Sequence, residues 1–217
     1  MPSSRQQTLA APPVPTLPDP GAAYSEKTSR SSNGLVRTFM LRLTGALQSL
    51  FGPGGAQYLD SPNGLFFNTA SQAPAVVNTA YLVTFNQTYL NNYVTLVNSS
   101  RITASIDGVY GFKYTGNLES QSSNAKTVKF WVRRNGADIG YSSAPYTLSG
   151  SGTFGRITWN FIIDLAAEEY IEIMWASDAT NVELHSTPAS APYPAIASSV
   201  CSVIYVSALP PTRPTPP

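Results

Sequence analysis

Between residues 75 and 209 apolar and polar side chains alternate with a period of two. The alternation is clearest over residues 109–118, 128–134, 157–163 and 170–175. In a β-strand successive side chains point to opposite faces, so each run predicts a half-buried strand. Sequences typical of turns separate the runs: Asp107-Gly108, Asn135-Gly136 and Ser149–Gly152. With about nine or ten such strands and no helical pattern between them, the fold class is mainly β, an antiparallel β-sandwich of the jelly-roll type.

Several of these strands carry large apolar residues on both faces. Trp131 lies opposite the face formed by Val128, Phe130 and Val132, and near the end of the pattern Val203 and Tyr205 lie opposite Val200, Ile204 and Val206. One face of each sheet fills the sandwich, so a second apolar face predicts an interface between subunits. We place Trp131, Val203 and Tyr205 in that interface. The alternative is scattered apolar surface residues, which are normal in globular proteins.

Residues 34–51 form the one convincing helical pattern. Its apolar positions are spaced four, three, four and three: Val36, Met40, Leu43, Leu47 and Leu50. Ser32 or Asn33 can cap its start, and the Gly-rich stretch 52–55 ends it. Such a narrow seam favours a short parallel bundle between identical chains, and it leaves dimer and trimer open. The alternative is a helix packed on its own domain.

Proline marks both ends of the chain. Six of the 18 prolines lie in the first twenty residues and five in the last eight. Proline lacks a backbone donor and fixes φ, so residues 1–33 and 210–217 are expected to be extended. We interpret 1–33 as an anchoring arm that becomes ordered on another protein, with free tails as the alternative. The predicted organisation is therefore arm 1–33, helix 34–51, Gly/Pro linker 52–74, sandwich 75–209 and tail 210–217.

Composition excludes several classes of function. The net charge is +1 and only 12% of residues are charged, which gives no broad electrostatic reason to bind nucleic acid. No run of 18 apolar residues occurs, so no membrane insertion is expected. One cysteine and one histidine rule out an intrachain disulfide, a thiolate cluster and a His-rich zinc site.

The candidates for chemistry in the sequence are weak. His185 is the only base available to a serine triad, and no Gly-x-Ser-x-Gly elbow accompanies it. Glu168-Glu169 and Asp164 lie close in sequence and could serve glycoside hydrolysis, but adjacent acids at a strand junction are usually part of a solvated turn. Calcium could bind at loops through Asp107, Asp138 or Asp178. We predict no catalytic residue, no metal site and no cofactor.

Two loops have the composition of recognition surfaces. Residues 87–93 and 177–194 combine tyrosine with small polar residues, a mixture that suits adaptable binding. Tyr89, Tyr93 and Tyr193 are the candidates for contact with a host-cell glycan or protein. Solvent-facing loops without a ligand are the alternative.

A series of motifs resembles a domain that is common in bacteriophage structural proteins. The motifs follow in order: Asn78-Thr79-Ala80-Tyr81, Ser99-Ser100-Arg101-Ile102-Thr103, Asp107-Gly108-Val109-Tyr110, Trp131-Val132-Arg133-Arg134-Asn135-Gly136, Trp159-Asn160-Phe161 and Tyr170-Ile171-Glu172-Ile173-Met174-Trp175. Members of that family resemble the trimeric jelly rolls of tumour necrosis factor and of the complement globular head. The resemblance covers roughly residues 35–208 and includes Asp60–Phe66.

The resemblance implies a homotrimeric virion protein without catalytic residues, assembled in the bacterial cytoplasm. The arm 1–33 would then dock on another phage protein, either the capsid or a tail adaptor or nozzle, and the jelly roll would be displayed as a fibre, knob or spike. An adhesin that binds a host glycan or receptor and a capsid cement or decoration protein are the alternatives.

Overall fold

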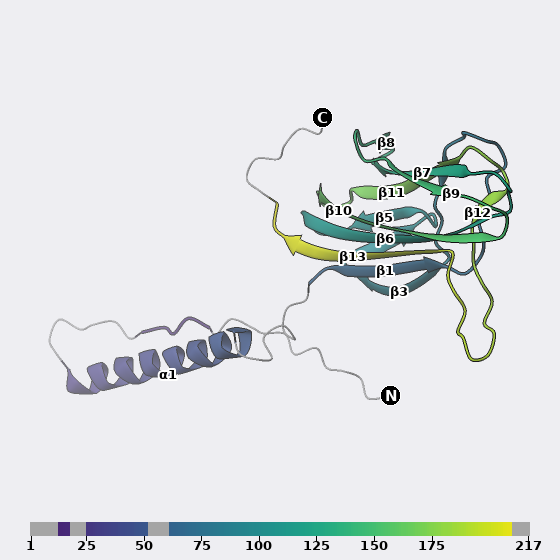
Figure 1. The fold of residues 1–217 in the computed structure, drawn as a ribbon. Coiled ribbons are helices and arrows are strands. Elements are labelled where there is room, and N and C mark those ends of the chain that lie inside the picture. Colours follow the sequence, from purple (N-terminus) through teal and green to yellow (C-terminus); the bar gives the residue numbers. More distant parts are fainter. Residues whose placement is uncertain (1–12, 18–24, 52–60, 210–217) are drawn as a thin grey trace. The chain divides into compact units, whose positions relative to one another are not determined.

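The computed structural model describes residues 13–17, 25–51 and 61–209. The chain divides into two compact units, Met1–Asp60 and Ser61–Pro217. Within the described residues the first unit holds a single helix and the second holds thirteen strands (Figure 1). The expected tail 210–217, and residues 1–12 and 18–24 of the expected arm, lie outside the described part of the chain.

Helix α1 spans Glu26–Phe51, so it begins at Glu26 and not at residue 34. The sequence pattern missed the first two turns because residues 26–33 are polar and carry no apolar periodicity. They are held instead by local interactions: Arg30 Nη2 lies 2.5 Å from Glu26 Oε1, one helical turn away, and Glu26 lies in the first turn, where a negative charge suits the helix dipole. Ser32 and Asn33 therefore lie inside the helix and do not cap it. Residues 13–17 belong to neither helix nor strand.

The strands form two antiparallel sheets. Sheet A contains β1 (Asn63–Asn68), β3 (Gln87–Asn92), β6 (Gly108–Ser120), β10 (Thr153–Leu165), β12 (Val182–Leu184) and β13 (Ser199–Ser207). Sheet B contains β2 (Tyr81–Leu82), β4 (Val94–Val97), β5 (Arg101–Ala104), β7 (Lys126–Arg134), β8 (Ala137–Asp138), β9 (Ala144–Leu148) and β11 (Tyr170–Ser177). The order in sheet A is β10-β6-β13-β1-β3, with β12 also paired to β6, and the order in sheet B is β4-β5-β11-β7-β8, with β2 on β11 and β9 on β7. The predicted mainly β, two-sheet antiparallel sandwich with one N-terminal helix is confirmed.

Sheet A includes a segment that was expected to be linker. Strand β1 lies between β13 and β3, where Asn68 pairs with Ser199 and the Tyr205 amide donates to the Pro62 carbonyl. Its inward positions are Gly64, Phe66 and Asn68, and only Phe66 is a large apolar residue. Because glycine and asparagine occupy the other inward positions, the period-two signal is too weak to be read from the sequence.

The hairpin between β7 and β8 follows the sequence signal closely. Asn135 and Gly136 have φ values of 47° and 83°, and Arg134 pairs with Ala137 across them. Two central residues with positive φ give the turn that matches the twist of paired strands. The Asn135 side chain then accepts from the Tyr170 amide at 3.0 Å and donates to Glu169 Oε1 at 2.9 Å, which fixes the hairpin against the turn before β11.

The core lies between the two sheets and is rich in aromatic rings. Phe130 and Trp175 of sheet B stack with centroids 6.4 Å apart, and Tyr114 of sheet A contacts Phe130 at 5.6 Å. Burial of the Tyr110 hydroxyl raises its pKa to about 12, and burial also raises the pKa values of Tyr114 and Cys201. This core fixes which side chains of sheet A point inward and therefore which point out.

Candidate functional site

The outer face of sheet A consists of the side chains that point away from sheet B. On β6 these are the odd-numbered residues from Val109 to Glu119, because the even-numbered residues are buried in the core. Strand pairing extends the positions up to Thr115 into rows across β10, β6 and β13, and it extends Glu119 into a row across β10, β6 and β12. The rows change from apolar at one end of the face to charged at the other.

The apolar end is centred on a glycine. Ile162 and Ile204 both pair with Gly111, and their side chains are 68% and 59% exposed. Val206, in the same strand as Ile204, is 52% exposed. Because Gly111 has no side chain, the two isoleucines border a hollow of about 660 Å³, whose other lining residues include Phe161 and Ser202. The hollow is mainly apolar and open to solvent.

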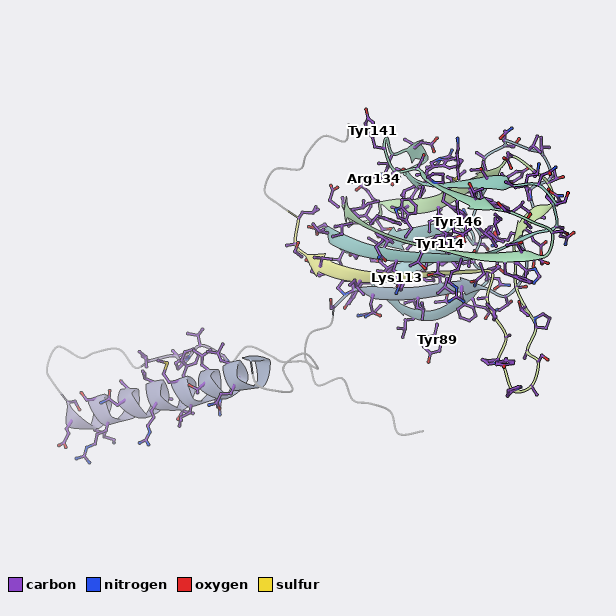
Figure 2. All side chains as sticks on the ribbon, viewed as in Figure 1. Tyr89, Lys113, Tyr114, Arg134, Tyr141 and Tyr146 are labelled. Atoms are coloured by element: carbon purple, nitrogen blue, oxygen red, sulfur yellow. The ribbon has the colours of Figure 1, made fainter. Side chains whose placement is uncertain are left out.

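The middle of the face is polar. Lys113 is flanked by Asn160 and Ser202, and it points out of the sheet (Figure 2). In the next rows Thr115 Oγ1 lies 3.5 Å from Thr158 Oγ1, and Arg156 Nε donates to Asn117 Oδ1 at 2.8 Å. A second hollow of about 460 Å³ lies over these rows and reaches the segment 195–197.

The charged end contains a row of Phe154, Glu119 and Glu183 on β10, β6 and β12. His185 follows β12 and lies against both carboxylates. A third hollow, of about 330 Å³, is lined by Phe154, Arg156 and His185. One continuous face thus carries an apolar hollow, a polar band and a charged cluster.

The predicted interface residues of the sandwich do not lie on this face. Val203 is 1% exposed in the core, and Tyr205 packs against the core with its ring 5.6 Å from Tyr110, edge to face. Their expected role as a surface is corrected: the outward side of β13 is the other alternation, Val200, Ser202, Ile204 and Val206. Both alternations of β13 are apolar, so the sequence could not tell which faces the core.

Trp131 belongs to sheet B and is partly buried. Its indole Nε1 donates to Asp138 Oδ1 at 2.9 Å, and Arg133 Nε donates to the same oxygen at 2.9 Å. Both donors hold the pKa of Asp138 below its usual range, and the hydrogen bond from the Trp131 indole has the larger effect. Trp131 is therefore tied to its own hairpin and does not share a surface patch with β13.

The apolar seam of α1 is exposed within its own unit. Val36, Met40 and Leu47 are 42%, 55% and 45% exposed, and Leu43 is partly buried. The side chain of Leu50 lies outside the described part of the structure. The helix thus offers an unpartnered apolar stripe of the kind that a bundle of helices buries.

The three candidate recognition tyrosines are exposed but come from separate places. Tyr89 lies on the edge strand β3 and points away from the sandwich (Figure 2). Tyr93 follows β3 with a φ of 52°. Tyr193 is 73% exposed at the tip of a hairpin closed by reciprocal backbone hydrogen bonds with Ser190. The β3 edge and the Tyr193 hairpin are thus two distinct candidate contact points.

Two of the acids that could have served hydrolysis, Asp164 and Glu169, are held in an ion-pair network. Arg134 Nη2 lies 2.5 Å from Glu169 Oε2, and Arg134 Nη1 lies 3.5 Å from Asp164 Oδ1. Glu169 Oε2 also accepts from the Ala166 amide. The network ties β7 to the turn before β11 and gives these carboxylates a structural role.

Comparison with known proteins finds similarity among solved structures only. No family model and no curated protein matches the chain. Among solved structures, the globular domain of zebrafish complement 1qA protein is similar over 69% of this chain and 99% of that chain, with 12% identity and a TM-score of 0.43. The similarity is one of fold alone, and strand pairing already defines that fold as a sandwich.

Of the residues described, α1 is the only helix, and it lacks an apolar stretch that could cross a bilayer.

Proposed function

We propose that the chain is a non-enzymatic homotrimeric virion protein of a bacteriophage, displayed on the particle as a fibre, knob or spike. The observation that carries the proposal is the pair of unpartnered apolar surfaces, one on each unit. The seam of α1 and the apolar end of the outer face of sheet A both carry large apolar side chains that remain exposed to water in a single chain. Association of identical chains buries both surfaces at once.

The shape of the apolar end favours a ring over a twofold dimer. A twofold axis through the Gly111 hollow would place that hollow against its own copy in the neighbouring chain, leaving unfilled space. Filling a hollow requires a different, protruding part of the neighbour. When such a head-to-tail contact between unlike patches is repeated by a rotation that closes, it gives a ring, and the smallest such ring has three subunits.

Tyr141 is a protruding side chain suited to that contact. It is fully exposed, with a φ of 60°, and it extends from the turn after β8 (Figure 2). A non-glycine residue in this left-handed region carries backbone strain, and a fully exposed ring gives the fold little in return. Tyr141 also borders a hollow of about 290 Å³ that includes Ile162 and Phe161.

The virion role is supported by the phage-like motif series and by the proline-rich arm. Arm residues 1–33 would lie along another virion protein, the capsid or a tail adaptor or nozzle, and would lose little conformational entropy on docking because proline already restricts them. In the structure residues 26–33 of this segment are helical, so the extended part of the arm is residues 1–25 at most.

Sedimentation or light scattering of the full chain tests the assembly. We expect a trimer at micromolar concentration for the unmodified chain and a shift to monomer for Ile204→Asp, since a charge at the rim of the hollow would be buried unpaired. Val76→Asp is the matched control, because Val76 is 56% exposed in a loop away from this face. A monomeric unmodified chain would refute the proposal.

Deletion of residues 1–25 tests the anchor separately. The shortened chain should remain trimeric and should fail to enter phage particles in a complementation assay. Normal incorporation would exclude the arm as the anchor while leaving the trimer intact.

Host contact is a second candidate function, favoured by the 73% exposure of both Tyr89 and Tyr193. A rigid hairpin tip presents Tyr193, and exposed aromatic residues are common anchors in binding surfaces. Replacing Tyr89, Tyr93 and Tyr193 together by alanine should weaken adsorption to host cells without changing the trimer. Unchanged adsorption would argue against these positions.

A further inference from the structure

We propose that Glu119, Glu183 and His185 form a binding site for a divalent transition-metal ion, with Zn²⁺ as the simplest occupant. This goes beyond the proposed trimer and does not depend on it. It also reverses the expectation, drawn from the sequence, that the protein has no metal site.

The three donor groups converge at one point of the outer face of sheet A. His185 Nδ1 lies 2.6 Å from Glu183 Oε1 and 2.8 Å from Glu119 Oε2. One ligand atom from each residue lies within 4.8 Å of the others. Tetrahedral ligands at 2.0–2.1 Å from zinc are separated by roughly 3.3 Å, so small side-chain rotations would admit an ion.

The backbone places these donors firmly. Glu119 and Glu183 are directly opposite on the paired strands β6 and β12. His185 is two residues after Glu183, and its amide donates to the Asn117 carbonyl of β6 at 2.7 Å. Every donor is therefore held by strand pairing and not by a free loop, which limits the entropy lost when an ion binds.

The placement of the two glutamates independently calls for a cation. Like charges directly opposite on paired strands destabilise a sheet. Their side chains are only 16% and 25% exposed, so water screens the repulsion poorly. Arg156, on the same face, donates to Asn117. Among the described residues His185 is the group that contacts both carboxylates, and a dication held between the three donors would neutralise the charges of the two glutamates.

The donor chemistry selects the class of ion. One imidazole nitrogen and two carboxylate oxygens suit Zn²⁺ and its neighbours in the first transition series, while Mg²⁺ and Ca²⁺ prefer oxygen donors alone. Three protein donors leave a further coordination position, and the 330 Å³ hollow lined by His185 gives solvent access to this region.

Calorimetric titration of the chelator-treated full chain with Zn²⁺ alone tests the site. We expect one ion per chain and at least about a tenfold loss of affinity in both Glu119→Gln and Glu183→Gln, which keep the side-chain shape and remove the charge. Glu168→Gln is the matched control, because Glu168 is an exposed acid on a turn outside the cluster. It should bind Zn²⁺ like the unmodified chain.

A second measurement guards against a variant that fails to fold. Co²⁺ added to the unmodified chain should give a visible absorption band that Zn²⁺ abolishes and that millimolar Mg²⁺ leaves in place. Absence of saturable Zn²⁺ binding, or affinities of both glutamine variants within twofold of the unmodified chain, would overturn the proposal and leave the cluster as a contact between a histidine and two carboxylates.

Discussion

At the scale of single residues, the motifs that resemble phage proteins have a physical meaning in this structure. Arg101, from the Ser99–Thr103 motif, places its Nε 3.2 Å from the Glu172 carboxylate of β11 and its guanidinium 4.7 Å from the centroid of the Tyr170 ring. Glu172 is 5% exposed and also accepts from Ser100 at 3.4 Å. Motifs that lie seventy residues apart in sequence therefore meet around one buried carboxylate.

Arg101→Ala should destabilise the sandwich because it removes the cation beside a buried charge. We expect a loss of about 2 kcal/mol, below the 3–5 kcal/mol typical of fully buried pairs because the arginine side chain is 41% exposed. Denaturant unfolding measures the effect. Arg133→Ala breaks the more exposed pair with Asp138 and should cost less than about 1 kcal/mol. Equal losses in the two variants would contradict the argument.

The buried tyrosines predict how stability depends on alkaline pH. Burial raises the pKa of Tyr110 to about 12 and also raises that of Tyr114. A group that keeps its proton longer in the folded state contributes its full stability below the unfolded pKa, about 10 for tyrosine, and that stability is lost as the pH rises above it. The midpoint of denaturant unfolding should therefore decrease as the pH is raised above about 10. The decrease should be less steep in Tyr114→Phe. Tyr193→Phe, which removes the hydroxyl of a 73% exposed side chain at a hairpin tip, should follow the unmodified chain.

At the scale of elements, sequence periodicity was most informative where a strand has one polar face. β10 and the β7–β8 hairpin agree with the pattern because alternation and turn chemistry point to the same answer. The pattern failed for β1, whose inward positions are mostly small or polar, and for the start of α1, which is held by a local ion pair. It also failed for β13, because in a strand that is apolar on both faces the sequence does not show which set of alternate residues faces the core.

For the candidate site, the sequence could predict what depends on residue spacing within one element but not what depends on the pairing of strands. The seam of α1 was readable from spacing alone. The hollow at Gly111 was not, because it depends on the register that places Ile162 and Ile204 on either side of one glycine. Likewise, His185 is two residues from Glu183, but only the pairing of β12 with β6 adds Glu119 to the cluster.

Helix α1 should be stabilised by association of chains. Its seam residues Val36, Met40 and Leu47 are exposed within their own unit, so an isolated helix gains little from them. We expect Met40→Lys to lower the helical signal in circular dichroism and to make it depend on chain concentration. Thr38→Lys, on another side of the helix, is the control and should leave both unchanged. A helical signal equal in Met40→Lys and the unmodified chain at all concentrations would show that the seam has no partner.

At the scale of the whole molecule, folding of the sandwich and assembly of the trimer should be separable. The core that folds one chain lies between the sheets, whereas the apolar end of the outer face of sheet A contributes little to that core. Substitutions on this face should therefore change the oligomeric state while leaving the unfolding of the single sandwich nearly unaltered.

Filling the hollow at Gly111 tests this separation. In Gly111→Leu the new Cβ would lie 3.4 Å from Ile204 Cγ1 and from Val206 Cγ2, an ordinary packing distance, so the single sandwich can accept it. The rest of the leucine side chain would occupy the space that we assign to the neighbouring subunit, and the trimer should dissociate at micromolar concentration.

Gly108→Ala is the opposite case, because its Cβ would clash with the Tyr205 ring inside the sandwich. That variant should lose about 1–3 kcal/mol of stability from overpacking. Gly111→Leu that remains trimeric with unchanged stability would show that the neighbour does not enter the hollow, and the interface would then have to lie elsewhere on the sandwich.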